Sequence, residues 1–229
     1  MRKIWMSAAA AGLTALLTAC GTAGNAAETG NAQSAAPVAT AENGNHRILI
    51  AYFSYGENAE LPDGADASAS ASIQPSAEGL TGNTGLIARD IQKAAGGTLF
   101  SIRTETPYPD TYQATVDQGR VEQQQNARPA LSAHVENMAD YDIIFLGYPN
   151  WWGDMPMPLY SFLDEYDLSG KTIIPFCTSG GSALSDTVNA IRNAEPDAAV
   201  MDGFHVSGSS AAGAEGSVLN WIRSIHLEK

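Results

Sequence analysis

Short apolar runs are the strongest feature of the hydrophobic pattern along the chain. The three clearest span Ile48–Phe53, Ile143–Tyr148 and Thr172–Phe176, and they contain isoleucine, tyrosine and phenylalanine without polar alternation. Such runs are typical of strands that are covered on both faces, as in a parallel sheet. A weaker run over Thr98–Ile102 predicts a fourth strand, and Ala198–Val206 contains the fifth. Pro175 conflicts with the third run, because proline cannot donate to a ladder of hydrogen bonds. It is tolerable if the chain is already leaving the sheet there.

Segments with helical spacing separate these runs. Apolar residues recur at intervals of three and four, which places them on one face of a helix. The stripes are Ile87, Ile91, Ala94 and Ala95 before Gly96-Gly97; Leu159, Phe162 and Leu163; Leu184, Val188 and Ile191; and Val218, Ile222 and Ile225. The range Tyr112–Ala127 predicts a further, mostly polar helix. Alternating strands and helices predict a doubly wound α/β fold, whose ligands bind beyond the carboxyl ends of the strands.

The first residues have the composition of an export signal. Arg2 and Lys3 precede an uncharged apolar stretch, and the segment is shorter than a membrane-spanning helix requires. Its end, Leu17-Thr18-Ala19-Cys20-Gly21, resembles the lipobox of bacterial lipoproteins. This resemblance implies a signal peptide over residues 1–19, a lipid on Cys20 and attachment to the cell envelope, on the outer face of a membrane or in the periplasm. An ordinary secretory signal is the alternative.

The following residues predict a flexible tether. Residues 21–46 contain eight Ala, four Gly and four Asn, which is too little apolar surface to offset the entropy of folding. We therefore divide the chain into a signal peptide (1–19), a lipidated cysteine with its tether (20–46) and one folded domain (47–229). If Cys20 carries a lipid, Cys177 has no partner for a disulfide.

Charge excludes one class of partner. The chain has 12 basic and 25 acidic residues, for a net charge of −13. Because binding to nucleic acid requires basic patches, we expect no nucleic-acid partner.

The loop after the first predicted strand has the composition of an anion site. Ser54 ends that strand, and Thr81, Gly82, Asn83 and Thr84 begin the next predicted helix, where backbone amides and the helix dipole attract anions. Because no Lys or Arg occurs between Ile48 and Ala88, this is not a P-loop, and a phosphate here is held by hydroxyls and amides. Alternatively, Thr81 or Asn83 only caps the helix.

Two further loops lie at predicted strand ends. Pro149, Asn150, Trp151, Trp152 and Gly153 follow the second run, and adjacent tryptophans suit stacking on a planar ligand. One of the two tryptophans can instead fill the gap between a helix and the sheet. After the third run come Thr178, Ser179, Gly180 and Gly181, where glycine allows the backbone to approach a ligand. The same composition is also common in a plain strand-to-helix turn.

Together, the three loops resemble those of the flavodoxin family, as found in bacterial flavodoxin-like proteins. The resemblance covers most of residues 47–229 and implies a five-stranded parallel sheet of order 2-1-3-4-5 with helices on both faces. It also implies an FMN site at the known position between the first and third strands of that family. The chain differs from common flavodoxins in an insert of 26 residues, Tyr55–Leu80, within the phosphate loop.

The resemblance assigns a role to each loop. Ser54 and Thr81–Thr84 would hold the phosphate, as flavodoxins typically do without a basic side chain. Asn150, Trp151, Trp152 and Gly153, with Pro149 before them, would border the isoalloxazine ring. Residues 178–181 would contact the pyrimidine end of that ring.

These roles make an FMN-binding redox protein our leading hypothesis. It would carry electrons between partners or to a small acceptor, and its acidic surface would favour a partner with a basic docking face. One alternative is an enzyme that reduces quinones or other small acceptors with NADH or NADPH. Another is a lipoprotein that binds its ligand on the same scaffold without flavin.

Other chemistry has weaker support. A thiol hydrolase would need Cys177 to act with His205 and Asp202, but no motif joins these residues. The four histidines, His46, His134, His205 and His226, lack the spacing of metal ligands. We therefore expect no metal.

Overall fold

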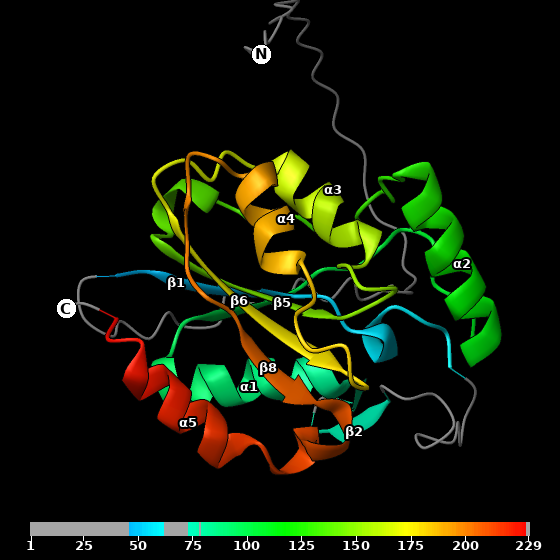
Figure 1. The fold of residues 1–229 in the computed structure, drawn as a ribbon, viewed down its shortest axis with the longest axis horizontal. Coiled ribbons are helices and arrows are strands. Elements are labelled where there is room, and N and C mark those ends of the chain that lie inside the picture. Colours follow the sequence, from blue (N-terminus) through cyan, green and yellow to red (C-terminus); the bar gives the residue numbers. More distant parts are fainter. Residues whose placement is uncertain (1–45, 62–72, 78, 228–229) are drawn as a thin grey trace, which may run out of the picture. The chain divides into compact units, whose positions relative to one another are not determined.

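A parallel β-sheet forms the centre of the fold in the computed structural model, which describes residues 46–61, 73–77 and 79–227 (Figure 1). Its strands are β1 (Ile48–Tyr52), β4 (Thr98–Ser101), β5 (Ile143–Pro149), β6 (Thr172–Ser179), β7 (Ala199–Val200) and β8 (Phe204–Ser207). The order is β4-β1-β5-β6, followed by β7 and β8, which both pair with β6. Every pairing is parallel. This arrangement confirms the predicted order 2-1-3-4-5.

Helices cover both faces of the sheet, as predicted. They are α1 (Asn83–Ala95), α2 (Tyr112–Gln125), α3 (Met157–Glu165), α4 (Thr187–Ala194) and α5 (Glu215–Ser224). In Figure 1, α3 and α4 lie above the sheet, whereas α1 and α5 lie below it. Short 3-10 helices occur at Tyr55–Glu57 (η1), Met138–Asp140 (η2) and Gly208–Gly213 (η3).

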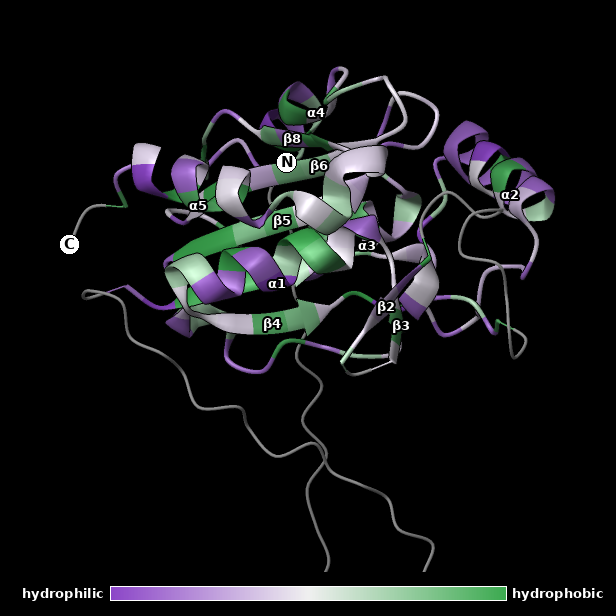
Figure 2. Ribbon diagram, turned by 90° about the horizontal axis from the view of Figure 1, so that it is seen from below, coloured by the Kyte–Doolittle hydropathy of each residue, from purple (hydrophilic) through white to green (hydrophobic). Residues whose placement is uncertain are grey.

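The two cores follow from the alternation of side chains along each strand. In β1, Ile48, Ile50 and Tyr52 pack with α1 and α5, whereas Leu49 and Ala51 pack with α3. All five side chains are buried, which explains why the run is continuously apolar. Figure 2 shows that the strands are mainly hydrophobic, whereas α2 is mainly hydrophilic.

Two short strands, β7 and β8, occupy the position of the fifth strand. Pro175 of β6 explains why the pairing is interrupted between them. The chain does not leave the sheet at Pro175, because β6 continues to Ser179, so the proline is tolerated for another reason. The carbonyl of Ile173 accepts a bond from Met201 on the β7 side, and Pro175 points to this same side because strand residues alternate. Its missing N–H therefore faces residues 201–203, between β7 and β8, where no ladder bond is required.

Helix boundaries differ from the predictions at a few ends. The helix α1 ends at Ala95, and Gly96 follows at φ +76°, as the Gly-Gly signal predicted. Leu184 lies in the turn before α4, and Ile225 lies just after α5. The helix α2 ends two residues before Ala127, with Asn126 in the left-handed conformation. Leu184 and Ile225 pack on the two cores all the same, so apolar spacing identified buried positions better than helix ends.

Part of the insert forms a β-hairpin near the carboxyl ends of the strands. Its strands are β2 (Gln74–Ser76) and β3 (Gly79–Thr81), which pair antiparallel. The predicted signal peptide, the lipid attachment site Cys20 and the tether up to residue 45 lie outside the described residues, as do insert residues 62–72 and 78. Within the described part of the chain, no helix is long and apolar enough to span a membrane.

Candidate functional site

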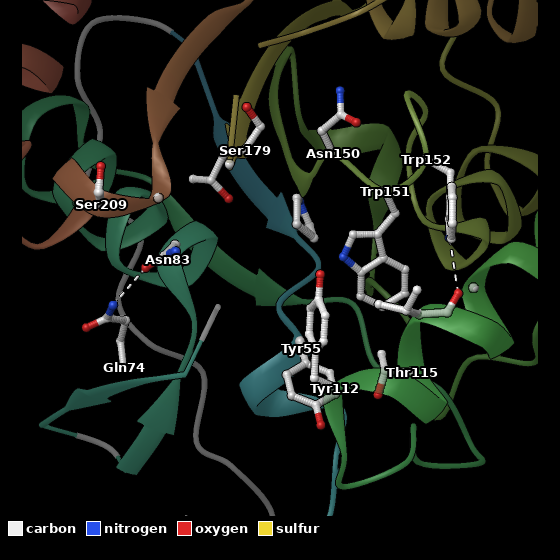
Figure 3. A pocket seen from close by; sticks show the side chains of 16 residues that line it. Tyr55, Gln74, Asn83, Tyr112, Thr115, Asn150, Trp151, Trp152, Ser179 and Ser209 are labelled. Atoms are coloured by element: carbon white, nitrogen blue, oxygen red, sulfur yellow. Dashed lines mark hydrogen bonds between the residues drawn. The ribbon is translucent and has the colours of Figure 1, made fainter. Parts of the chain in front are cut away.

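A cavity of about 630 Å³ opens where the strands end. Its walls come from β5 and β6 with their following loops, from α1, α2 and η3, and from Tyr55 and Gln74 of the insert (Figure 3). This is the edge at which doubly wound folds bind ligands. Among the described residues that line the cavity, none is charged.

The cavity has two chemically different ends. Figure 3 shows Gln74, Asn83 and Ser209 on one side, whereas Trp151 and Trp152 lie on the other. We call the first the polar end, which also includes Gly208, and the second the aromatic end, which also includes Tyr112.

Two hydrogen bonds hold the first turn of α1 at the polar end, and a third holds Thr81 just before it. The Thr84 and Thr178 hydroxyls lie 2.9 Å apart and connect α1 to β6. The Gln74 side-chain amide donates to Asn83 Oδ1 at 2.8 Å, which connects α1 to the insert. The Thr81 hydroxyl donates to Glu57 Oε1. The first backbone N–H groups of a helix have no acceptor within it, so this turn directs partial positive charge toward the cavity.

The predicted phosphate-loop residues are brought together here, but they do not all reach the cavity. Asn83 lines it directly. Thr84 is buried next to Thr178, and Gly82 is the N-cap residue of α1. Thr81 is fully buried, and its hydroxyl contacts Glu57 rather than the cavity.

Ser54 has an unsatisfied hydroxyl. It is buried two residues after β1 and does not line the cavity, and its Oγ has no hydrogen-bond partner among the described residues. A buried polar group without a partner is costly, which marks this hydroxyl as a candidate ligand contact.

A tight turn determines the positions of the two tryptophans. The backbones of Trp151 and Asp154 bond to each other in both directions, at 2.9 and 3.0 Å, around Trp152 and Gly153. These two central residues have φ values of +56° and +80°. Two left-handed central residues are typical of a type I′ turn, which is unfavourable for tryptophan. A strained backbone beside a cavity is a sign of function.

The turn gives the tryptophans different surroundings. Trp151 packs edge-on against Phe53 and Tyr108, with ring centroids 5.5 and 5.3 Å away. Trp152 is 50% exposed, donates from Nε1 to the Val116 carbonyl at 3.1 Å and lies 5.1 Å from the Arg120 guanidinium. Trp151 therefore fills the gap beside the sheet, whereas Trp152 presents its ring at the cavity.

Asn150 joins the loops after β5 and β6. Its Nδ2 donates to the Ala183 carbonyl at 3.0 Å and to Ser185 Oγ at 2.9 Å. Its Oδ1 accepts a bond from the Gly153 amide at 3.0 Å. Pro149 and Asn150 line the cavity. Gly153 does not line it and serves the turn instead.

The loop after β6 is held by Ser179. Its Oγ accepts bonds from the amides of Gly181 and Ala183 at 3.2 and 2.9 Å and lies 2.9 Å from His205 Nε2. Two amides fill both lone pairs of a hydroxyl, so Ser179 donates its proton to His205. Thr178, Ser179 and Gly180 line the cavity, whereas Gly181 does not.

The geometry gives no support to a thiol hydrolase. Burial raises the pKa of the Cys177 thiol to about 12, which removes the thiolate near neutral pH. His205 is bonded to Ser179, and Asp202 pairs with Arg192 at 3.1 Å. The described residues also contain no cluster of three or more His, Cys, Asp or Glu side chains suited to a metal.

Comparison with known families identifies the fold. The model of the flavodoxin family matches residues 75–225. The chain belongs to the flavodoxin family.

Solved structures agree with this membership. A protein from Bacteroides eggerthii, assigned to the flavoproteins, is 26% identical, with a TM-score of 0.61 over 80% of this chain and 100% of that chain. A similar protein from Bacteroides uniformis is 25% identical, with a TM-score of 0.59 over 78% and 98% of the two chains. A flavoprotein from Lactobacillus acidophilus, solved in complex with FMN, is 18% identical, with a TM-score of 0.52 over 75% and 99%, and it shows the shared fold. A search of curated proteins finds no match.

Several residues that line the cavity could not be identified from the sequence of this flavodoxin-family chain. Gln74 belongs to the insert, Gly208 and Ser209 follow the last strand, and Tyr112, Thr115, Val116 and Gly119 belong to α2. Gly119 is small because the Trp151 ring packs against α2 at this position; a Cβ there would lie 3.1 Å from the ring. The fold and the packing of Trp151 were needed to see it.

The different surroundings of the tryptophans predict different effects on stability. We expect Trp151→Ala to lower the free energy of unfolding by about 2–4 kcal/mol, because it removes two ring contacts and leaves a cavity. We expect Trp152→Ala to change it by less than about 1 kcal/mol, since half of that side chain is exposed. Urea unfolding of both variants measures this, and equal losses would contradict the assignment.

Proposed function

We propose that the chain binds FMN in this cavity and carries electrons between partners or to a small acceptor. One observation carries the proposal: an uncharged cavity with a helix N-terminus at its polar end and an exposed tryptophan at its aromatic end. FMN has the matching shape, with a phosphate at one end and a flat ring at the other. Membership of the flavodoxin family supports the same ligand.

The polar end suits a phosphate that is bound without a basic side chain. The first turn of α1 supplies amides and a favourable dipole. The buried Ser54 hydroxyl lacks a partner among the described residues, so a phosphate oxygen would satisfy it. Gly208 leaves space beside this turn, because a Cβ there would lie 2.8 Å from Asn83 Nδ2. Gln74, which bonds to Asn83, would border the phosphate from the insert.

The aromatic end suits the isoalloxazine ring. Trp152 and Tyr112 line the cavity and are 50% and 57% exposed, so each presents aromatic surface on which a planar ring can stack. The Arg120 guanidinium already lies over the Trp152 ring, so only one face of that ring is left for the flavin. Ser179 and Gly180 would contact the pyrimidine edge of the ring from the loop after β6. Bound FMN supplies the electron-transfer chemistry, and the protein holds the ring in position and sets its environment.

The charge of the chain suits a partner with a basic docking face. A net charge of −13 directs encounters toward positively charged surfaces. Electrostatic attraction of this kind increases association rates more than final affinity.

We also propose that the chain is exported and attached to a membrane through a lipid on Cys20. The support is the sequence Leu17-Thr18-Ala19-Cys20-Gly21 after a charged and then apolar N-terminus. The long Ala- and Gly-rich segment that follows would act as a tether for the flavodoxin domain.

Binding of FMN is the primary test. We expect the purified full-length protein to bind FMN with a shifted visible spectrum, and Trp152→Ala to weaken binding about 3- to 10-fold, because one stacking contact is lost. Val121→Ala serves as the control, since Val121 is exposed on α2 but does not line the cavity. A wild-type protein that binds no flavin would falsify the proposal.

Membrane attachment has a separate test. We expect the full-length protein, expressed in a bacterium, to fractionate with membranes and to carry a diacylglyceryl group on Cys20 in mass spectra. Cys20→Ala should move the protein to the soluble or unprocessed fraction. A mature N-terminus at any other residue, without lipid, would instead support an ordinary secretory signal.

A further inference from the structure

A carboxylate is buried directly behind the phosphate loop. The Glu57 side chain is only 4% exposed. The Tyr52 hydroxyl donates to both of its oxygens, at 3.0 and 3.1 Å, and the Thr81 hydroxyl donates to Oε1. Arg89 Nη1 lies 3.4 Å from Oε1, and Arg103 Nη2 lies 3.6 Å from Oε2. We call these five residues the Glu57 cluster.

The cluster holds this carboxylate in a fixed position. A buried carboxylate is costly unless charge and hydrogen bonds compensate it, and here hydroxyls and guanidinium groups do so. Burial and the neighbouring Glu57 charge raise the pKa of Tyr52 to about 12, so its hydroxyl remains a donor at neutral pH. A carboxylate with this many partners has one favoured position.

The cluster joins the two ends of the insert. Glu57 lies in η1, where the insert begins, and Thr81 lies in β3, where it returns to α1. The backbones meet closely at this point, because a Cβ on Gly56 would overlap the Thr81 carbonyl. Gly85 is equally constrained, since a Cβ there would overlap the Thr81 hydroxyl. Thr81 is therefore fixed by Glu57, η1 and α1 together.

Arg89 extends the cluster into the first turn of α1. Its Nη1 donates to the Gly85 carbonyl at 3.0 Å while it contacts Glu57 and Thr81. The guanidinium thus lies behind the turn whose amides face the cavity. Because it is paired with Glu57, it supports the turn without lining the cavity.

We propose that Glu57 is the positioning residue of the phosphate loop, and that it fixes Thr81 and the first turn of α1 across the insert. In a compact phosphate loop, chain connectivity alone keeps these segments together. Here the ends of a long insert must be held by side chains, since the entropy of loop closure opposes their contact. This inference rests on the proposed function and adds the residue that adapts the phosphate site to the insert.

Affinities for FMN and riboflavin test the inference, because these ligands differ only in the phosphate. In the full-length protein we expect Glu57→Gln to weaken FMN binding about tenfold, the cost of a lost charge-assisted hydrogen bond. Riboflavin binding should change by less than about threefold, so the preference for FMN falls. Fluorescence titration with both flavins gives the ratio of the two dissociation constants.

A second carboxylate provides a matched control. Glu122 Oε2 accepts a bond from the Tyr108 hydroxyl at 2.6 Å, but Glu122 lies on α2 and does not line the cavity. Glu122→Gln removes a tyrosine–carboxylate bond of the same kind, so it can lower stability but should leave the ratio unchanged. Thermal unfolding of both variants separates loss of stability from loss of phosphate recognition.

Thr81→Val gives an independent readout, including where Glu57→Gln does not fold. If Glu57 acts through Thr81, this variant also lowers the preference for FMN. The double variant then loses no more of that preference than the single variant with the larger loss. An unchanged ratio in both single variants, or an equal loss for both flavins, overturns the inference. A wild-type protein that binds FMN but shows no preference over riboflavin also overturns it. A wild-type protein that binds neither flavin instead overturns the proposed function.

Discussion

The site depends on the attachment of the first turn of α1 to the carboxyl edge of the sheet. Three contacts with separate parts of the chain make this attachment: Thr84 with Thr178 of β6, Asn83 with Gln74 of the insert, and Thr81 with Glu57 of η1. Each uses a polar side chain that the fold buries or half-buries. Together they place the amides of a helix N-terminus at a cavity whose described lining residues are all uncharged. We propose that this arrangement lets a strongly acidic chain bind an anion without a lysine in the loop.

The aromatic end depends on a division between adjacent tryptophans. Trp151 contributes to the core through Phe53 and Tyr108. Trp152 is turned outward by a left-handed backbone that tryptophan adopts only at an energetic cost. The turn is held by Asn150, which also fixes the loop after β6. One turn thus gives adjacent tryptophans different surroundings, and we propose that Trp151 contributes to stability and Trp152 to ligand recognition.

Much of this arrangement was predictable from the sequence, and the rest required spatial information. Continuous apolar runs identified the buried strands, and strand ends directed attention to Ser54, Asn150 and Ser179. Pro175 was misinterpreted, because its compatibility with β6 depends on a break in the neighbouring strand. Gln74 and Ser209 had no local signal, since they reach the cavity only through the path of the insert and of η3. Glu57 had no signal in the sequence, because its partners Thr81, Arg89 and Arg103 are distant along the chain.

A structure of the protein with FMN bound tests the central claim most directly. The account predicts phosphate oxygens within about 3.2 Å of Ser54 Oγ and of amides in the first turn of α1. It also predicts the isoalloxazine ring against Trp152. A phosphate bound instead at a basic side chain such as Arg120, or a ring outside this cavity, would contradict it.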